Sequence, residues 1–235
     1  MKSKSVVVLV GSVLSVMSAI AIAAPAGRDE VKRVGAATTV LNEMMRAEDK
    51  AIPRSIFEKA EAIAIFPGVK KAGFVVGGQW GRGIISVRDA GTRYWSSPAF
   101  LTLTGGSVGA QIGGTEIDLI LVIMNRAGVE HLLANQVKLG AEMSAAAGPV
   151  GRAGEASTDV QMHAQILSYS RSRGLFAGVT VNGSVVKEDV DANTRFYGKT
   201  LSSEDIVFDR AGVSPPSSGM LKNALARHSN KPSTN

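Results

Sequence analysis

Two arginines stand two residues apart in a stretch where polar and apolar residues alternate. Arg171 and Arg173 lie on the same face as Tyr169, within residues 169–183. Alternation with a period of two predicts a β-strand, and it places the two guanidinium groups about 7 Å apart. Guanidinium forks bind phosphate oxygens in pairs, so this spacing fits a cradle for an anionic group. A solvated strand face is the alternative, because arginines are mostly exposed.

Three more cations extend the candidate anion-binding set. Lys70, Lys71 and Arg82 lie in or beside the part of the chain that is rich in predicted strands. Each lysine or arginine close to an anionic bilayer contributes about 1 kcal/mol of attraction. Four such residues would therefore recruit the protein weakly to a membrane, provided that they converge on one face.

A serine between glycines raises a second possibility. Residues 105–109 read Gly-Gly-Ser-Val-Gly, which matches the Gly-x-Ser-x-Gly elbow of serine hydrolases around Ser107. That elbow needs a strand before the serine and a helix directly after it, and residues 110–114 are a poor helix start. Asp118 or Asp159, with His131 or His163, follow in the chain. The hydrolase stays a remote alternative, because the motif alone occurs often by chance.

The remaining residue types argue against catalysis and against cofactors. The chain has no cysteine, which excludes disulfides, thiol catalysis and thiolate metal ligands. Its histidines, His131, His163 and His228, are widely spaced, and no carboxylate pair stands out. The glycine-rich segments lack the Gly-Lys-Ser/Thr of a phosphate loop. We expect no metal, no cofactor and no enzymatic activity.

The first half of the chain predicts two helices followed by a run of strands. Helices are expected over residues 28–45 and 52–62, and a short buried strand over 63–66 that ends in a turn at Pro67-Gly68. Strands separated by Gly81 and by Gly-Gly pairs then continue to Met124. Residues 116–124 are apolar on both faces from Leu119 onward, which predicts a central strand.

The second half predicts a mixture of helices and strands. A helix is expected over residues 126–135 and an alternating strand over 138–147. The stretch at 169–183 should bury one face, formed by Leu175, Ala177, Val179 and Val181. Helices over 191–197 and 202–208 follow, the second with Ser202 as its N-cap. The predicted fold is one α+β domain, a mainly antiparallel, strongly curved sheet or partial barrel with helices packed at its ends.

Composition divides the chain into residues 1–23, 24–210 and 211–235. Lys2 and Lys4 precede an apolar run over 6–22 that ends in Ala-Ile-Ala, the pattern of a secretory signal peptide. A single membrane anchor is the alternative, near the lower limit of about 17 residues. The last part holds a Pro/Ser linker, a short helix and a polar tail. That helix could lie on a membrane surface, although docking on its own domain or fraying is favoured because short helices are marginal alone.

The net charge is mildly basic. The formal charge is +6, and it falls to +4 without Lys2 and Lys4. Such a balance favours anionic surfaces weakly. It does not indicate nucleic-acid binding, which needs a clustered basic face.

Five segments in order resemble one known family. Residues 168–178 read Ser-Tyr-Ser-Arg-Ser-Arg-Gly-Leu-Phe-Ala-Gly, and the other segments are residues 64–73, 95–100, 105–113 and 147–152. Together they resemble the SYLF domain family of lipid-binding and actin-regulating domains, over roughly residues 40–207. The chain looks like an exported, bacterial member of that family.

The resemblance implies a non-enzymatic module that binds anionic phospholipids, with phosphoinositides as the ligands of eukaryotic members. Arg171, Arg173, Lys70, Lys71 and Arg82 would supply the positive charge. An exported, periplasmic or secreted protein would not meet actin, so actin is an unlikely partner in that compartment. A protein-interaction or envelope-scaffold module is the second hypothesis.

Overall fold

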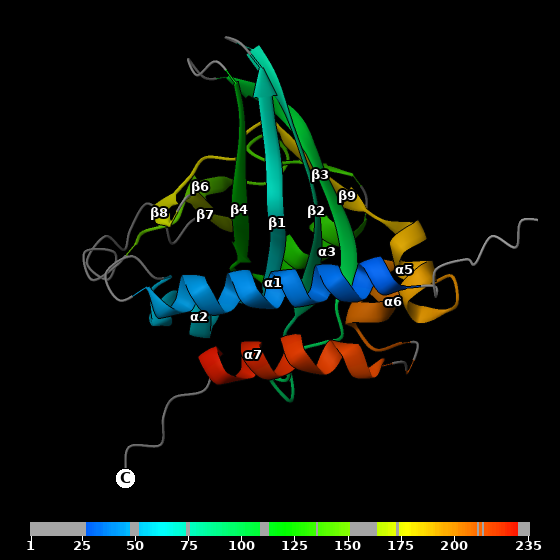
Figure 1. Cartoon of the computed structure of the whole chain (residues 1–235). Coiled ribbons are helices and arrows are strands. Elements are labelled where there is room, and N and C mark those ends of the chain that lie inside the picture. The colour runs from blue at the N-terminus through cyan, green and yellow to red at the C-terminus, as the bar shows by residue number, and fades with distance from the viewer. Residues whose placement is uncertain are drawn as a thin grey trace, which may run out of the picture.

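The structure is a computed structural model that describes residues 27–47, 52–73, 76–108, 113–134, 136–150, 164–172, 174–210, 212 and 214–229. One curved β-sheet forms its centre, and helices cross one end of that sheet (Figure 1). The predicted fold class is confirmed, because the sheet is mostly antiparallel and curls into a half-barrel. The segment predicted to be a signal peptide, residues 1–23, lies outside the described residues.

Four long strands make the middle of the sheet. They are β1 (Ala62–Gly73), β2 (Val76–Val87), β3 (Ala99–Val108) and β4 (Gly113–Ile123). Their spatial order is β3-β2-β1-β4, and every neighbouring pair is antiparallel. The central position predicted for residues 116–124 is confirmed, because β4 has a partner on each side and is fully buried from Leu119 to its end.

Short strands extend the sheet at both flanks. Beyond β3 lie β9 (Ser184–Glu188) and then β5 (Val137–Lys138). Beyond β4 lies β7 (Ile166–Ser172), which pairs with β6 (Ala145–Ala147) in parallel and with β8 (Leu175–Gly178) in antiparallel orientation. The sheet that they complete is curved (Figure 1).

The helices gather at one end of the strands. The longest, α1 (Arg28–Arg46), crosses one face of the sheet and packs on β1 and β2 (Figure 1). Acidic residues in its first turn and Arg46 in its last turn complement the helix dipole. The other helices are α2 (Arg54–Lys59), α3 (Arg126–Ala134), α5 (Val190–Tyr197), α6 (Ser203–Val207), the 3-10 turn η2 (Pro216–Ser218) and α7 (Gly219–Ser229). Within the described part of the chain, no helix is both long and apolar enough to cross a bilayer.

The C-terminal helix docks on its own domain, as the favoured sequence interpretation expected. α7 lies beside α1, on the side away from the strands, and also contacts α2 (Figure 1). Leu221, Ala224 and Leu225 are fully buried in this contact, whereas Met220 is 52 % exposed. The helix therefore closes the core instead of presenting an apolar stripe to its surroundings.

The turn predicted at Pro67-Gly68 is wrong, because β1 continues through it. The register with β4 shifts between Phe66 and Val69, so the two residues form a bulge inside one long strand. Gly68 adopts a φ of 61°, and its N–H donates to Asp118 Oδ1 at 2.9 Å. Proline and glycine occur both in turns and at bulges inside strands. Here β1 pairs with β2 and β4 on either side of the two residues, so they form a bulge in one continuous strand.

Strand breaks predicted at other glycines are also wrong. β2 passes through Gly81, and β3 passes through Gly105. Glycine serves close packing here, since a Cβ on Gly83 would lie 2.4 Å from the Phe66 ring. Conversely, the single strand predicted over residues 138–147 is split into β5 and β6 by a turn in which Gly140 has a φ of 81°.

The β7–β8 hairpin forms, but its predicted buried face is wrong. Leu175 is 67 % exposed and Ala177 is also exposed, whereas Phe176 packs partly against the core. β8 pairs only with β7 among the described strands, so little covers it. Of the four residues expected inside, only Val181 is buried.

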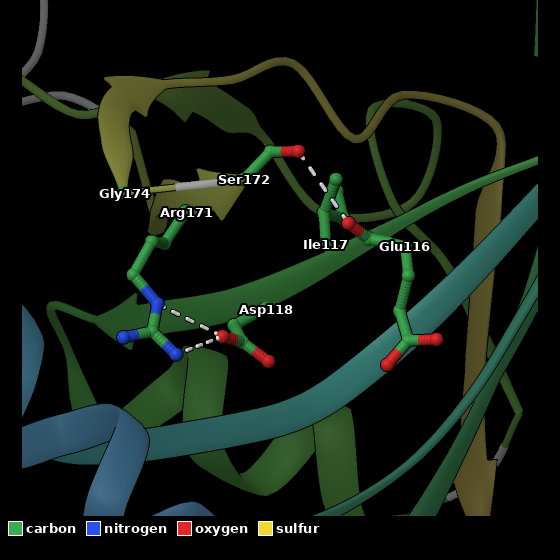
Figure 2. A pocket seen from close by; sticks show the side chains of 6 residues that line it. All are labelled: Glu116, Ile117, Asp118, Arg171, Ser172 and Gly174. Carbon is green, nitrogen blue, oxygen red and sulfur yellow. Dashed lines mark hydrogen bonds and ion pairs between the residues drawn. The ribbon is translucent and has the colours of Figure 1, made fainter.

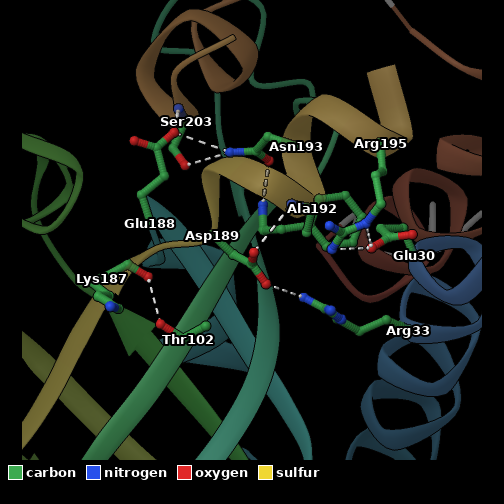
Figure 3. Close-up of polar contacts among 11 residues, drawn as sticks. Glu30, Arg33, Thr102, Lys187, Glu188, Asp189, Ala192, Asn193, Arg195 and Ser203 are labelled. Carbon is green, nitrogen blue, oxygen red and sulfur yellow. Dashed lines mark hydrogen bonds and ion pairs between the residues drawn. The ribbon is translucent and has the colours of Figure 1, made fainter. Parts of the chain in front are cut away.

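A network of hydrogen bonds and ion pairs joins α1 to the sheet and to helices α5 and α6 (Figure 3). Asp189 caps α5 and accepts from Arg33 of α1 at 3.0 Å. Asn193 accepts from the Phe100 N–H of β3 at 2.8 Å and donates to Ser203 at the start of α6. Glu30 of α1 and Arg195 of α5 form a further ion pair at 2.9 Å, with Glu30 buried. These contacts fix where α1 crosses the sheet.

Candidate functional site

An aromatic residue and two cations share one face of the sheet. Lys70 of β1 lies directly opposite Trp80 of β2, and Arg82 follows two residues later on the same face. The Arg82 guanidinium carbon is 5.3 Å from the Trp80 ring centroid, within the range of a cation–π contact. Trp80 is 45 % exposed, and both cations are exposed.

A third cation continues this surface across the sheet. Arg82 pairs in register with Thr102 of β3, which pairs with Lys187 of β9 (Figure 3). Lys187 is exposed, so a row of polar side chains runs over three strands. None of Lys70, Arg82 and Lys187 forms an ion pair with an acid among the described residues. We call these three residues and Trp80 the cationic face.

The remainder of that sheet face is covered by α1. Ile84 lies two residues beyond Arg82 and is fully buried, opposite Phe100 of β3. The guanidinium of Arg33 on α1 lies 5.2 Å from the Phe100 ring centroid, which places the helix over this face. The cationic face is therefore the part left open beyond α1, toward the strand ends (Figure 1).

Lys71 points away from the cationic face. It is the next residue after Lys70 in β1, and successive strand residues project to opposite sides. Lys71 is half-buried, and burial lowers the pKa of its ammonium group. Of the predicted anion-binding residues, the structure brings Lys70 and Arg82 together but not Lys71.

Arg171 is held by two acids (Figure 2 shows one of them). Its Nε and Nη2 donate to Asp118 Oδ2 at 2.9 and 2.6 Å, and its Nη1 donates to Glu43 of α1. Burial by itself would lower the pKa of Arg171, but the hydrogen bonds and charges of the two carboxylates outweigh it and raise that pKa. The arginine therefore clamps α1 to β4 and β7. Arg173 lies outside the described residues.

The groove beside this clamp is acidic. It has a volume of about 330 Å³ and is lined by Glu116, Ile117, Asp118, Arg171, Ser172 and Gly174 (Figure 2). Two carboxylates face one arginine that is already paired, so the groove does not offer a free positive charge. It is a poor cradle for phosphate.

A second arginine, Arg88, is buried, and both of its terminal nitrogens are hydrogen-bonded, whereas its buried Nε has no partner among the described residues. It is 4 % exposed, and burial lowers its pKa to about 10. Its guanidinium donates to the carbonyls of Glu58 and Phe57 at the end of α2, at 2.6 and 3.1 Å, and to Ser229 of α7 at 3.0 Å. Although Arg88 lines a cavity of about 360 Å³, these bonds join α2 to α7. Its role is structural.

His228 joins the two helices that cross the sheet end. Its Nε2 lies 3.1 Å from Asn42 Oδ1 on α1. Burial lowers the pKa of the imidazole, and the positive charges of Arg227, Arg46 and Arg54 lower it further. The neutral form is therefore favoured in the folded protein.

The hydrolase geometry is not assembled. Ser107 lies inside β3, which runs on to Val108, and β4 already begins at Gly113. A nucleophile elbow requires a helix directly after its serine. Asp118 is bound by Arg171, and His131 is exposed on α3, while His163 lies outside the described residues. Within the described ranges, no group of acidic or imidazole side chains could hold a metal ion.

The family is decided by the match over residues 104–228. The model of the family described as "Ysc84: Las17-binding protein actin regulator" matches this span, which is more than half of the chain. The chain belongs to the Ysc84 family. The resemblance to the SYLF family is thereby confirmed.

Relatives in the Ysc84 family are about a third identical to this chain over the spans that align with it. It is 34 % identical to Protein YSC84 of Saccharomyces cerevisiae over 178 residues, which are 74 % of this chain and 37 % of that protein. It is 34 % identical to LAS seventeen-binding protein 3 of the same species over 172 residues, 72 % of this chain and 36 % of that protein. It is 35 % identical to the human SH3 domain-containing YSC84-like protein 1 over 161 residues, 68 % of this chain and 46 % of that protein. The chain thus spans between a third and a half of these relatives.

Trp80, which belongs to the cationic face of this Ysc84-family chain, was not among the binding residues predicted from the sequence. Its signal was present, since a tryptophan and an arginine two residues apart on a strand share a face. Lys187 could be placed beside them only through the β3–β9 register, because it lies more than 100 residues further along the chain.

Proposed function

We propose that this Ysc84-family chain is an exported, non-enzymatic module that binds anionic phospholipid membranes through its cationic face. The observation that supports the proposal is the grouping of Lys70, Arg82 and Lys187 around the exposed Trp80. The grouping matters because none of these cations forms an ion pair with an acid among the described residues, although Glu116 of β4 lies in register opposite Lys70.

The size of the expected attraction follows from the number of cations. Three basic side chains near an anionic surface contribute about 3 kcal/mol, which is about a hundredfold in affinity. Tryptophan prefers the membrane interface, because its ring is amphipathic and its N–H can reach water or headgroups. Attraction of this size gives weak, salt-sensitive and reversible binding.

Arg171 has a different role in this proposal. The sequence suggested it as part of a phosphate cradle, together with Arg173. With Asp118 and Glu43 bound to its guanidinium, we assign Arg171 to holding α1 in place. The ligand of the cationic face is the phosphate of a lipid headgroup, and the predicted leader at residues 1–23 would deliver the protein to an envelope membrane.

Co-sedimentation with vesicles tests the proposal. The form that begins at Ala24 is suitable, because it removes the apolar run, and the buried core of the described residues extends from Val34 to Leu225. We expect binding to vesicles of phosphatidylcholine with phosphatidylglycerol at low salt, and little binding to phosphatidylcholine alone. No binding to the anionic vesicles at low salt would refute the proposal.

Paired variants locate the binding surface. Lys70→Gln with Arg82→Gln should weaken binding about thirtyfold, since two contributions of about 1 kcal/mol are lost. The matched control is Lys222→Gln with Arg227→Gln, which removes the same charge from α7, on the far side of α1 from the strands. Equal weakening by both pairs would mean that net charge, and not the cationic face, drives association.

Protein binding is the second candidate. Its support is the family description and the name of LAS seventeen-binding protein 3, which state that those proteins bind Las17. Immobilised Las17 and the chain from Ala24 provide the test. Binding at micromolar concentration that is unaffected by Lys70→Gln with Arg82→Gln would favour a separate protein-binding surface, and absence of binding would count against this candidate.

A further inference from the structure

Charged side chains stop near one level along β1, β2 and β4, and the fourth long strand, β3, has none. Lys70 lies opposite both Trp80 and Glu116, so β1, β2 and β4 reach this level together. Lys71 is the next residue of β1, and beyond it the sequence has no charge over residues 72–81 or 99–115. From Trp80 to the end of β2 at Val76 the strand rises about 13 Å. β1, β2 and β4 therefore carry charges up to about this level, β3 carries none, and past it the strand ends are uncharged.

Trp80 is the large exposed side chain at the border of this uncharged end among the described residues. The next described row on the same face consists of Ala72, Gly78, Gly106 and Gly114, which pair in register across β4, β1, β2 and β3. None of them has a side chain longer than a methyl group. An indole at the border between charged and uncharged surface has the position that tryptophan takes at a membrane interface.

The position of α1 excludes a flat approach by a membrane. The helix lies on the same face as Trp80 and is about 10 Å across, so it stands above the open part of the sheet. A planar bilayer laid along that face would meet α1 before it reached the cationic face. A bilayer that approaches from the strand ends does not meet α1 first, because that helix crosses the opposite end of the strands (Figure 1).

We infer that the protein docks on anionic bilayers end-on, with the ends of β1 to β4 in the membrane interface and Trp80 at the depth of the headgroups. This inference rests on the proposed function and assigns its orientation. Lys70 and Lys71 project to opposite sides of β1, so an end-on approach brings both to the phosphate layer. Lys71, which has no place on the cationic face, acquires a role in this orientation.

Penetration is shallow in this arrangement. The strand ends pair their backbone groups with one another, as any structure that enters a bilayer must. However, the outer edges of β3 beyond Gly105 and of β4 before Asp118 have no partner strand among the described residues. Unpaired backbone groups are costly in hydrocarbon, so the strand ends stop at the boundary of the acyl chains.

Tryptophan fluorescence tests the orientation with little modification of the protein. The chain has two tryptophans, and Trp95 is 4 % exposed while Trp80 is 45 % exposed. On anionic vesicles, we expect the emission to shift to shorter wavelength and to be quenched by lipids brominated near the top of the acyl chain. Trp80→Phe should abolish both changes and leave the buried Trp95 signal. Vesicle binding without these changes would overturn the end-on orientation while leaving the proposed function in place.

A pair of substitutions at Gly78 tests the same orientation independently of Trp80. A Cβ at this position meets no atom within 4 Å, so both variants fit the fold, and thermal melting would verify this. We expect Gly78→Glu to weaken vesicle binding about fivefold or more, because a carboxylate would enter the interface. Gly78→Ala should stay within about twofold of the original chain. Equal binding by the two variants would overturn the end-on orientation. If the chain without substitutions does not bind anionic vesicles at all, the proposed function itself is refuted.

Discussion

Substitution of Arg171 tests whether this arginine stabilises the fold through its ion pairs or binds the ligand. Asp118 and Arg171 have side chains that are 17 % and 23 % exposed, between the surface and the interior. Exposed pairs contribute about 0.2–1 kcal/mol, whereas breaking a buried pair costs about 3–5 kcal/mol. For Arg171→Gln we therefore expect a loss of about 2 kcal/mol in the free energy of unfolding. In a domain of this length, that loss lowers Tm by about 6 °C.

A double-mutant cycle measures the interaction directly. Asp118→Asn and Arg171→Gln, singly and together, should give a coupling energy of about 1–2 kcal/mol in urea unfolding followed by circular dichroism. The control is Lys32→Gln, which breaks an ion pair whose side chains are 72 % and 83 % exposed and should change stability by less than about 0.5 kcal/mol. A coupling energy near zero, together with loss of vesicle binding in Arg171→Gln, would refute the clamp and restore the arginine to the binding site.

Three further predictions concern the packing of the domain. His228 has a lowered pKa when folded, so the unfolded chain takes up its proton first as the pH falls; stability is full above the ordinary imidazole pKa of about 6.5 and declines below it. His228→Gln should flatten the decline in unfolding free energy between about pH 7.5 and 5, measured by urea titration, and an unchanged slope would contradict this assignment. Gly83→Ala should cost about 1–3 kcal/mol because its methyl group would overlap Phe66, whereas Gly78→Ala should be nearly neutral; equal melting temperatures would contradict the packing. Arg88→Met should lower the unfolding free energy by about 2 kcal/mol or more, since two carbonyls at the end of α2 lose their donor, and Arg88→Lys should recover little of it in the same melts.

Local patterns in the sequence predicted several elements correctly. The run of apolar residues from Leu119 onward indicated a central strand, because only a strand covered on both faces can bury both sets of side chains. Ser202 was recognised as an N-cap, and its hydroxyl accepts from the Asp205 N–H. Such features depend on a few neighbouring residues, so a single sequence contains the information.

Features that depend on pairing between distant segments were not predictable. Arg171 meets Asp118 across 53 residues and Glu43 across 128, and no local pattern links them. Gly81 was interpreted as a strand break, although it lies inside β2, where a Cβ would be 2.8 Å from Val69 Cγ2 of the neighbouring strand. The cationic face follows from the registers of four strands, so its cations could be named from the sequence but not grouped.

The contact between α1 and α7 links the timing of folding to the synthesis of residues 219–229. The first described helix is covered by the last described one, so the apolar side of α1 remains without this cover until those residues have been synthesised. Under the export that we propose, this delay would favour crossing a membrane in unfolded form, because the closing layer cannot assemble before residues 219–229 are present. Maturation would then finish only in the compartment to which the protein is delivered.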